Sequence, residues 1–114
     1  MAAPHPKQLA SFVRATAVLA LSASQQEAWL ASLAIQVPVD ELALEFDDGH
    51  HLLPQWVDAG WLPSASVPAF SVLDRALAEM SGKEHADLWS LTALHDAPEW
   101  AHVRALAAEV LLAL

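Results

Sequence analysis

The chain has 114 residues, the length of one domain, and its lack of cysteine excludes a disulfide-stapled fold and a thiolate metal centre. Hydrophobic residues make up 55% of it without any run long enough to span a bilayer, so disorder and a membrane span are both excluded. Fourteen acidic against five basic side chains give a net charge of −9, which argues against direct nucleic-acid or anionic-membrane binding and favours a basic partner.

Two helices are predicted in the first third of the chain. Apolar residues at three- and four-residue steps predict a helix from Pro6 to about Leu21. The sequence Ser24-Gln25-Gln26-Glu27 has the form of a capping box and predicts a second helix that runs to about Ile35. Val37-Pro38-Val39 ends this helix, because the residue before a proline avoids the α region.

The segment that follows is compatible with a helix or a strand. A helix capped by Asp40 places Leu42, Phe46 and Gly49 on one narrow face. A strand would alternate Leu42, Leu44 and Phe46 with polar residues and end in a turn. The strand places Leu44 better, but the chain offers no second convincing strand to pair with. The helix is therefore favoured.

The middle of the chain is divided by glycine and proline. A kink or a new helix start is expected near Pro54, and Gly60 is expected as a left-handed C-cap with Trp61 folding back. Ser64 or Ser66 is expected to cap the next helix, which carries Pro68 in its first turn. The inner stripe predicted for that helix is Phe70, Leu73, Leu77 and Met80.

The last third predicts two short helical turns and one long helix. The turns carry Leu88-Trp89 and residues 91–95, and Asp96 is expected to cap the last helix ahead of Pro98. The tryptophans are expected in the core by their helical phase, except Trp61, which is placed toward the surface. Together these elements predict an all-α fold, a compact bundle of about five or six short helices forming a single domain over residues 1–114.

The distribution of charged residues along the sequence is the strongest feature that the packing of helices does not explain. Neither lysine nor arginine occurs between Arg14 and Arg75. The charged side chains in that interval are Glu27, Asp40, Glu41, Glu45, Asp47, Asp48, Asp58 and Asp74. Like charges one helical turn apart destabilise a helix, and nothing nearby in the sequence offsets them. The acidic stretch is either a solvated surface that keeps an apolar chain soluble or a face kept for a cationic partner.

Asp47, Asp48, His50 and His51 could be interpreted as metal ligands, since imidazole and carboxylate suit divalent ions. Their spacing matches no zinc-enzyme pattern, and a third firm ligand would have to come from elsewhere. No nucleophile lies near them, and no phosphate-binding or hydrolase motif occurs. We therefore expect no metal site, no cofactor and no catalytic activity.

Several stretches resemble small acidic immunity proteins of bacterial toxin–immunity systems, such as contact-dependent growth inhibition. The likeness covers roughly residues 40–114. The stretches that carry it are Glu41-Leu42-Ala43-Leu44-Glu45-Phe46-Asp47-Asp48, Leu52-Leu53-Pro54-Gln55-Trp56-Val57, Ala59-Gly60-Trp61-Leu62, Met80-Ser81-Gly82, Leu88-Trp89, and Glu99-Trp100 with Val103-Arg104. The resemblance implies a soluble cytoplasmic inhibitor without catalysis, which blocks a toxin's active site or an adjacent exosite.

The expected function is thus to bind and neutralise a cognate toxin domain, a basic one such as a nuclease. Most of the expected contact residues are chosen because they are acidic, and Leu44 and Trp61 are added as apolar anchors. The full set is Asp40, Glu41, Leu44, Glu45, Asp47, Asp48, Asp58 and Trp61. The alternative is a self-associating helical scaffold or regulatory domain, which forms a homodimer through its last helix.

Overall fold

The computed structural model describes residues 4–34 and 36–114, and the ordered elements in these ranges are helices. In chain order they are α1 (Pro6–Leu19), α2 (Ala23–Leu33), α3 (Asp40–His50), α4 (Leu53–Asp58), the 3-10 turn η1 (Ser64–Ser66), α5 (Val67–Glu79), the 3-10 segment η2 (Lys83–Trp89), α6 (Leu91–Asp96) and α7 (Pro98–Leu112). The all-α prediction is confirmed, with more helical segments than expected.

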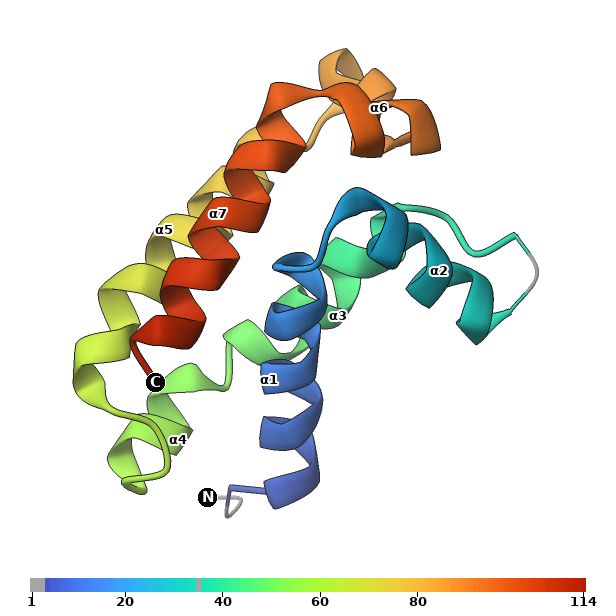
Figure 1. Ribbon diagram of the computed structural model, residues 1–114. Helices are drawn as coiled ribbons and strands as arrows, with labels where there is room; N and C mark the ends of the chain where they lie inside the picture. The colour runs from blue at the N-terminus through green and yellow to red at the C-terminus, as the bar shows by residue number, and fades with distance from the viewer. Residues whose placement is uncertain (1–3, 35) are drawn as a thin grey trace.

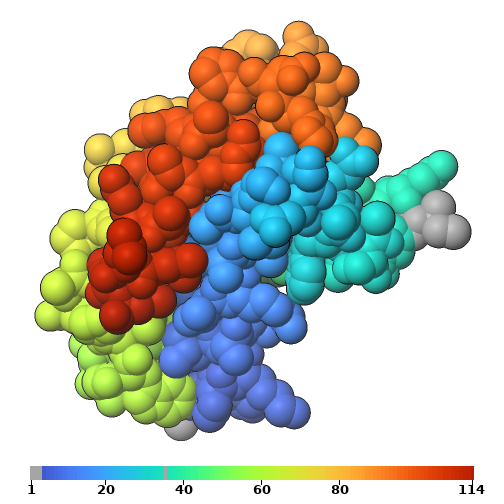
Figure 2. All heavy atoms as spheres, viewed as in Figure 1, coloured from blue at the N-terminus to red at the C-terminus, as the bar shows by residue number. Residues whose placement is uncertain are grey.

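The longer helices pack as two connected pairs (Figure 1). One pair is α1 on α3, the other is α5 on α7, and contacts of α1 with α7 and of α3 with α5 join them. Figure 2 shows α7 lying directly against α1 on one face of the molecule. The short helix α6 and the segment η2 cover one end of the α5–α7 pair (Figure 1). This arrangement leaves one side of α3 facing solvent.

An aromatic cluster lies where α1, α3, α4 and α5 meet. The ring of Phe12 is at its centre, with centroids 5.1 Å from Phe46, 5.3 Å from Trp56 and 5.0 Å from Phe70. Each of these four side chains is 1% exposed or less. Because each comes from a different helix, the cluster holds the two helix pairs together.

The interior stripe predicted for α5 is confirmed. The buried residues of α5 are Phe70, Leu73 and Leu77, and Met80, which follows the last residue of the helix, is buried as well. Trp100 lies in the core with Trp56, whereas Trp61 is 40% exposed, as expected. Trp29 and Trp89, which were also expected in the core, are only partly buried.

The predicted stop at Gly60 is also confirmed. Gly60 has a φ of +79°, and the amide of Trp61 donates to the carbonyl of Trp56 at 2.9 Å. The amide of Gly60 donates to the carbonyl of Val57 at 3.0 Å. These two bonds form a Schellman motif that satisfies the end of α4.

Several predicted caps are wrong. Helix α2 begins two residues early, because the Ser22 hydroxyl accepts from the Gln25 amide while the Gln25 side chain accepts from the Ser22 amide. Ser24 thus lies inside the first turn. Asp40 is the first residue of α3 rather than its cap, and Asp96 ends α6, so no side chain caps α7.

Other helix ends differ less. The first helix ends at Leu19, two residues before the expected end, and α2 ends at Leu33. The predicted end at Ile35 lies outside the described residues. Ser66 precedes α5 as expected, but its hydroxyl donates back to the Pro63 carbonyl at 2.6 Å instead of capping the helix.

Gly49 sets how closely α1 and α3 approach. It is buried within α3, and a Cβ atom placed on it would lie 2.6 Å from Cδ1 and 2.8 Å from Cβ of Phe12. These distances are far below van der Waals contact, and the Phe12 ring is enclosed by its aromatic neighbours. The absence of a side chain at this position therefore permits the crossing of the two helices.

Gly49→Ala is expected to destabilise the fold by about 1–2 kcal/mol. Alanine in a helix interior gains about 0.5–1 kcal/mol over glycine, but overpacking against Phe12 costs about 1–3 kcal/mol. The clash is the larger effect, because backbone and an enclosed ring must both shift. Urea unfolding measures the change, and a more stable variant would contradict the close crossing.

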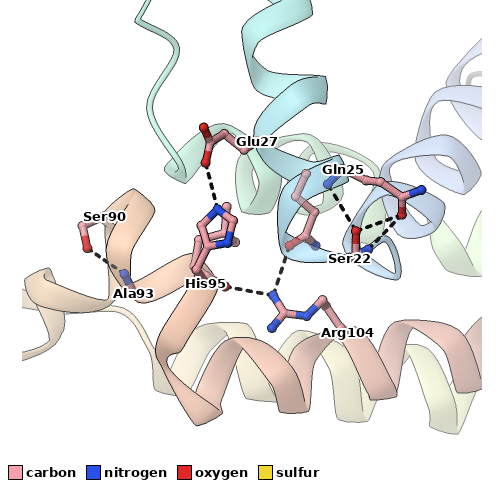
Figure 3. A network of polar contacts seen from close by, with 9 residues as sticks. Ser22, Gln25, Glu27, Ser90, Ala93, His95 and Arg104 are labelled. Carbon is pink, nitrogen blue, oxygen red and sulfur yellow. Dashed lines mark hydrogen bonds and ion pairs between the residues drawn. The ribbon is translucent and has the colours of Figure 1, made fainter.

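A buried polar network joins the two ends of the chain (Figure 3). Gln26 is completely buried, and its amide nitrogen donates to the carbonyls of Val18 at 3.1 Å and Leu19 at 3.0 Å. Its oxygen accepts from the Arg104 guanidinium at 3.2 Å, which also donates to the Leu94 carbonyl at 3.0 Å. The network therefore connects α1, α2, α6 and α7.

Gln26→Leu is expected to lower the free energy of unfolding by about 2 kcal/mol, because it leaves partly buried donors and acceptors unpaired. Arg104 and the Leu19 carbonyl both lose a partner. Thermal unfolding measures the change. Gln55→Leu, at an exposed glutamine of α4, is the matched control and should have little effect. Equal losses in the two variants would contradict the role of the network.

Candidate functional site

The segment 40–50 is a helix, and its two faces differ sharply. Leu42, Phe46 and Gly49 are buried, so the narrow apolar stripe predicted for the helical interpretation is confirmed and the strand is wrong. On the opposite face Asp47 and Asp48 are exposed. The amphipathic pattern of α3 therefore turns its carboxylates toward solvent.

Leu44 is at the centre of this solvent face. Its side chain is 52% exposed. The residues one turn before and after it are all acidic: Asp40, Glu41, Asp47 and Asp48. Among the described residues, every ion pair within 4.0 Å involves a histidine, and none involves these carboxylates. Asp48 also borders α1, together with Glu45, and we call the remaining four residues, Asp40, Glu41, Leu44 and Asp47, the α3 face.

On the α1 side, the charges of α3 meet cations. Glu45 and Asp48 line a hollow of 460 Å³ together with Lys7 and Arg14 of α1. Gly49 and the edge of Phe12 are also part of it. Nothing nearby in the sequence offsets Glu45 and Asp48, but helix packing brings cations from a distant part of the chain into the same hollow.

On its other side, α3 borders a groove. A hollow of 620 Å³ is lined by Asp40, Leu44, Lys83 and Trp89, among others. A second hollow of 230 Å³ lies between α3 and α5. Both include Leu44 and Ser81, so they lie next to each other, and together we call them the α3–α5 groove.

Two of the predicted contact residues lie elsewhere. Asp58 is the last residue of α4, and Trp61 follows the glycine stop. Both are exposed, but neither lines any of the hollows beside α3. Sequence reasoning grouped them with α3 by charge and exposure alone, whereas helix α4 carries them away from it (Figure 1).

The groove also contains residues that sequence reasoning did not select. Asp74 of α5 faces α3, and Trp89 forms a wall of the larger hollow. The Trp89 indole is held in place, since its nitrogen donates to the Met80 carbonyl at 2.8 Å and its ring meets Trp100 edge-on at 5.4 Å. No local signal marks either residue, because their position depends on how α5 and η2 pack against α3.

The histidines near the end of α3 point in different directions. The ring of His50 stacks on Phe46 at 5.4 Å, and its Nδ1 atom lies 3.6 Å from an oxygen of Asp74. His51 is exposed, with Nδ1 3.4 Å from the carbonyl of Asp47. In the part of the chain that the structure describes, no three histidine or acidic side chains come together as a metal site would require.

Comparisons with known proteins provide no relative. No known protein family matches the chain, and neither the curated proteins nor the solved structures contain a significant match. Within residues 4–34 and 36–114, no helix is both long and apolar enough to cross a membrane. The α3 face and the groove beside it are therefore the features from which a function is inferred.

Proposed function

We propose that this chain is an immunity protein, which binds a basic toxin domain such as a nuclease and neutralises it without catalysis. In this proposal the complex forms in the cytoplasm of the toxin-producing or target cell. The α3 face is the contact surface. The observation that carries the proposal is the exposure of Leu44, 52%, at the centre of a ring of carboxylates one helical turn away.

This arrangement has the anatomy of a protein interface. An apolar anchor surrounded by a polar rim excludes water at the centre of a contact, while the rim determines orientation. The net charge of −9 attracts a basic domain over a long distance, and charge complementarity raises association rates toward about 10⁸–10⁹ M⁻¹s⁻¹ at low salt. An enzyme that acts on nucleic acid has a basic cleft, which an acidic helix can occupy in place of phosphates.

The test begins with the intact chain as bait in a lysate of its source organism, at low and high salt. We expect a basic protein to be captured at low salt and released at high salt. The captured protein is then expressed alone and together with this chain, and cell growth is measured. Growth arrest that the chain relieves supports the proposal. A captured protein that is harmless, or whose toxicity the chain leaves unchanged, contradicts it.

Self-association is the second candidate function, supported by apolar side chains at the surface. Leu112 of α7 is 88% exposed, and Val72 of α5 is 44% exposed. Sedimentation across a range of concentrations tests this candidate. A dimer that Leu112→Asp dissociates, in a chain that captures no toxic partner, would favour the scaffold over the immunity protein.

A further inference from the structure

The smaller hollow of the α3–α5 groove combines charge with apolar walls. It has a volume of 230 Å³. Asp47 of α3 and Asp74 of α5 contribute carboxylates from two different helices, and the walls between them include Leu44, Leu77 and Ala78. The hydroxyl of Ser81 at its margin donates to the Leu77 carbonyl at 3.3 Å, so it is already used within the protein.

The charge of this hollow differs from that of its neighbours. The 460 Å³ hollow contains Lys7 and Arg14, and the 620 Å³ hollow contains Lys83. Among the described residues that line the 230 Å³ hollow, by contrast, there is neither lysine nor arginine. The described lining of this hollow therefore has two carboxylates and neither lysine nor arginine, so its charge favours a cationic guest.

A histidine lies beside one of the two carboxylates. His50 directs Nδ1 toward Asp74 at 3.6 Å, while its Nε2 atom is buried with no hydrogen-bond partner among the described residues. The ring does not line the hollow itself, so the charged side chains among the described lining residues are the two carboxylates.

The chemistry of the hollow selects one type of side chain. An arginine has an apolar stem that can lie along leucine and alanine, and a planar head with five N–H donors. Its weakly hydrated guanidinium loses less on entering a partly apolar space than an ammonium does, and it can bridge two carboxylates. A lysine would satisfy the charge but bring one compact, strongly hydrated donor group.

We infer that the 230 Å³ hollow is a pocket for one arginine side chain of the protein partner, with Asp47 and Asp74 as its ligands. This inference rests on the proposed function and adds to it the residue type at the centre of the contact. Leu44 borders the pocket, so the arginine and an apolar partner side chain dock side by side. The partner thus presents an arginine beside an apolar residue.

The test uses the isolated chain and small probes, monitored by the backbone amide shifts of α3 and α5 in NMR. N-acetyl-arginine amide is titrated to about 50 mM at constant ionic strength, since one side chain is expected to bind in the millimolar range. N-acetyl-citrulline amide, which has the same shape without the charge, is the probe control. We expect saturable shifts around Asp47 and Asp74 with the arginine probe alone.

Two variants with the same change in charge locate the binding. Asp74→Asn is expected to weaken binding of the arginine probe about tenfold, the loss of a charged hydrogen bond. Asp48→Asn, on the α1 side of α3, is expected to leave it unchanged. The amide spectrum of each variant shows whether it remains folded, and Asp47→Asn provides a second pocket variant if Asp74→Asn does not.

Absence of saturable shifts with the arginine probe would overturn the pocket, as would equal binding of the citrulline probe or equal effects of Asp74→Asn and Asp48→Asn. The titration requires no toxin, so its outcome is separate from the growth test. A failed titration beside a neutralised toxin removes the pocket and keeps the proposed function. A successful titration in a chain for which no toxic partner is found keeps the pocket and removes the proposed function.

Discussion

Phe12→Ala is expected to lower the free energy of unfolding by about 3–5 kcal/mol, the range for truncating a fully buried aromatic side chain. The ring contacts one aromatic side chain from each of α3, α4 and α5, with centroids 5.0 to 5.3 Å away. Its removal leaves a cavity where both helix pairs meet, and the enclosing rings cannot collapse into it without leaving their own positions. Urea unfolding measures the loss.

Leu9→Ala is the matched control for this substitution. Leu9 is on the same helix and packs against the same core, but it is only partly buried, so its truncation should cost clearly less. A second comparison uses Gly49→Ala in the Phe12→Ala background, where the contact with Cδ1 is removed but the contact with the Cβ atom, at 2.8 Å, remains. The added alanine should therefore cost less than it does in the native background. Equal costs in both backgrounds would contradict the packing.

The double substitution Asp47→Lys/Asp74→Lys is expected to slow association with a basic toxin domain by about a hundredfold at low salt. It replaces attraction by repulsion at the 230 Å³ hollow, whose described lining includes neither lysine nor arginine. Stopped-flow mixing with the captured toxin domain measures the rate. The effect should shrink as salt increases, because screening weakens exposed charges.

Glu45→Lys/Asp48→Lys changes the net charge by the same amount and serves as the control. These carboxylates share a hollow with Lys7 and Arg14, so they contribute less to the field that a partner meets. We expect a smaller decrease in rate, mainly from the lower net charge. Equal rates for the two double variants would mean that overall charge alone steers the partner and that the groove is not the contact.

Much of the fold could be predicted because local rules decide it. Pro68 and Pro98 are in the first turns of α5 and α7, and Gly60 ends α4, where fixed and left-handed backbone angles allow few alternatives. Caps were harder. Ser22 and Ser24 each precede a glutamine or glutamate by three residues, and only the path of the preceding helix determines which serine caps α2.

Only the part of the candidate site that lies within α3 could be predicted from the sequence. The spacing of Leu42 and Phe46 identifies the inner face of α3, and therefore its acidic outer face. Which neighbours flank that face depends on contacts between distant parts of the chain. Arg14 and Asp74 are both far from α3 in sequence, yet each lines a hollow beside it. Periodicity within one helix contains no information about them.

The close crossing at Gly49 has a consequence for binding entropy. Because the backbone of α3 lies directly against the Phe12 ring, the helix cannot slide or rotate on α1 without a collision. The face around Leu44 is thus already ordered before a partner arrives, and only side-chain rotamers remain to be frozen in a complex. Association with this surface should therefore carry a small unfavourable conformational entropy, and the free and bound forms of α3 should superpose closely.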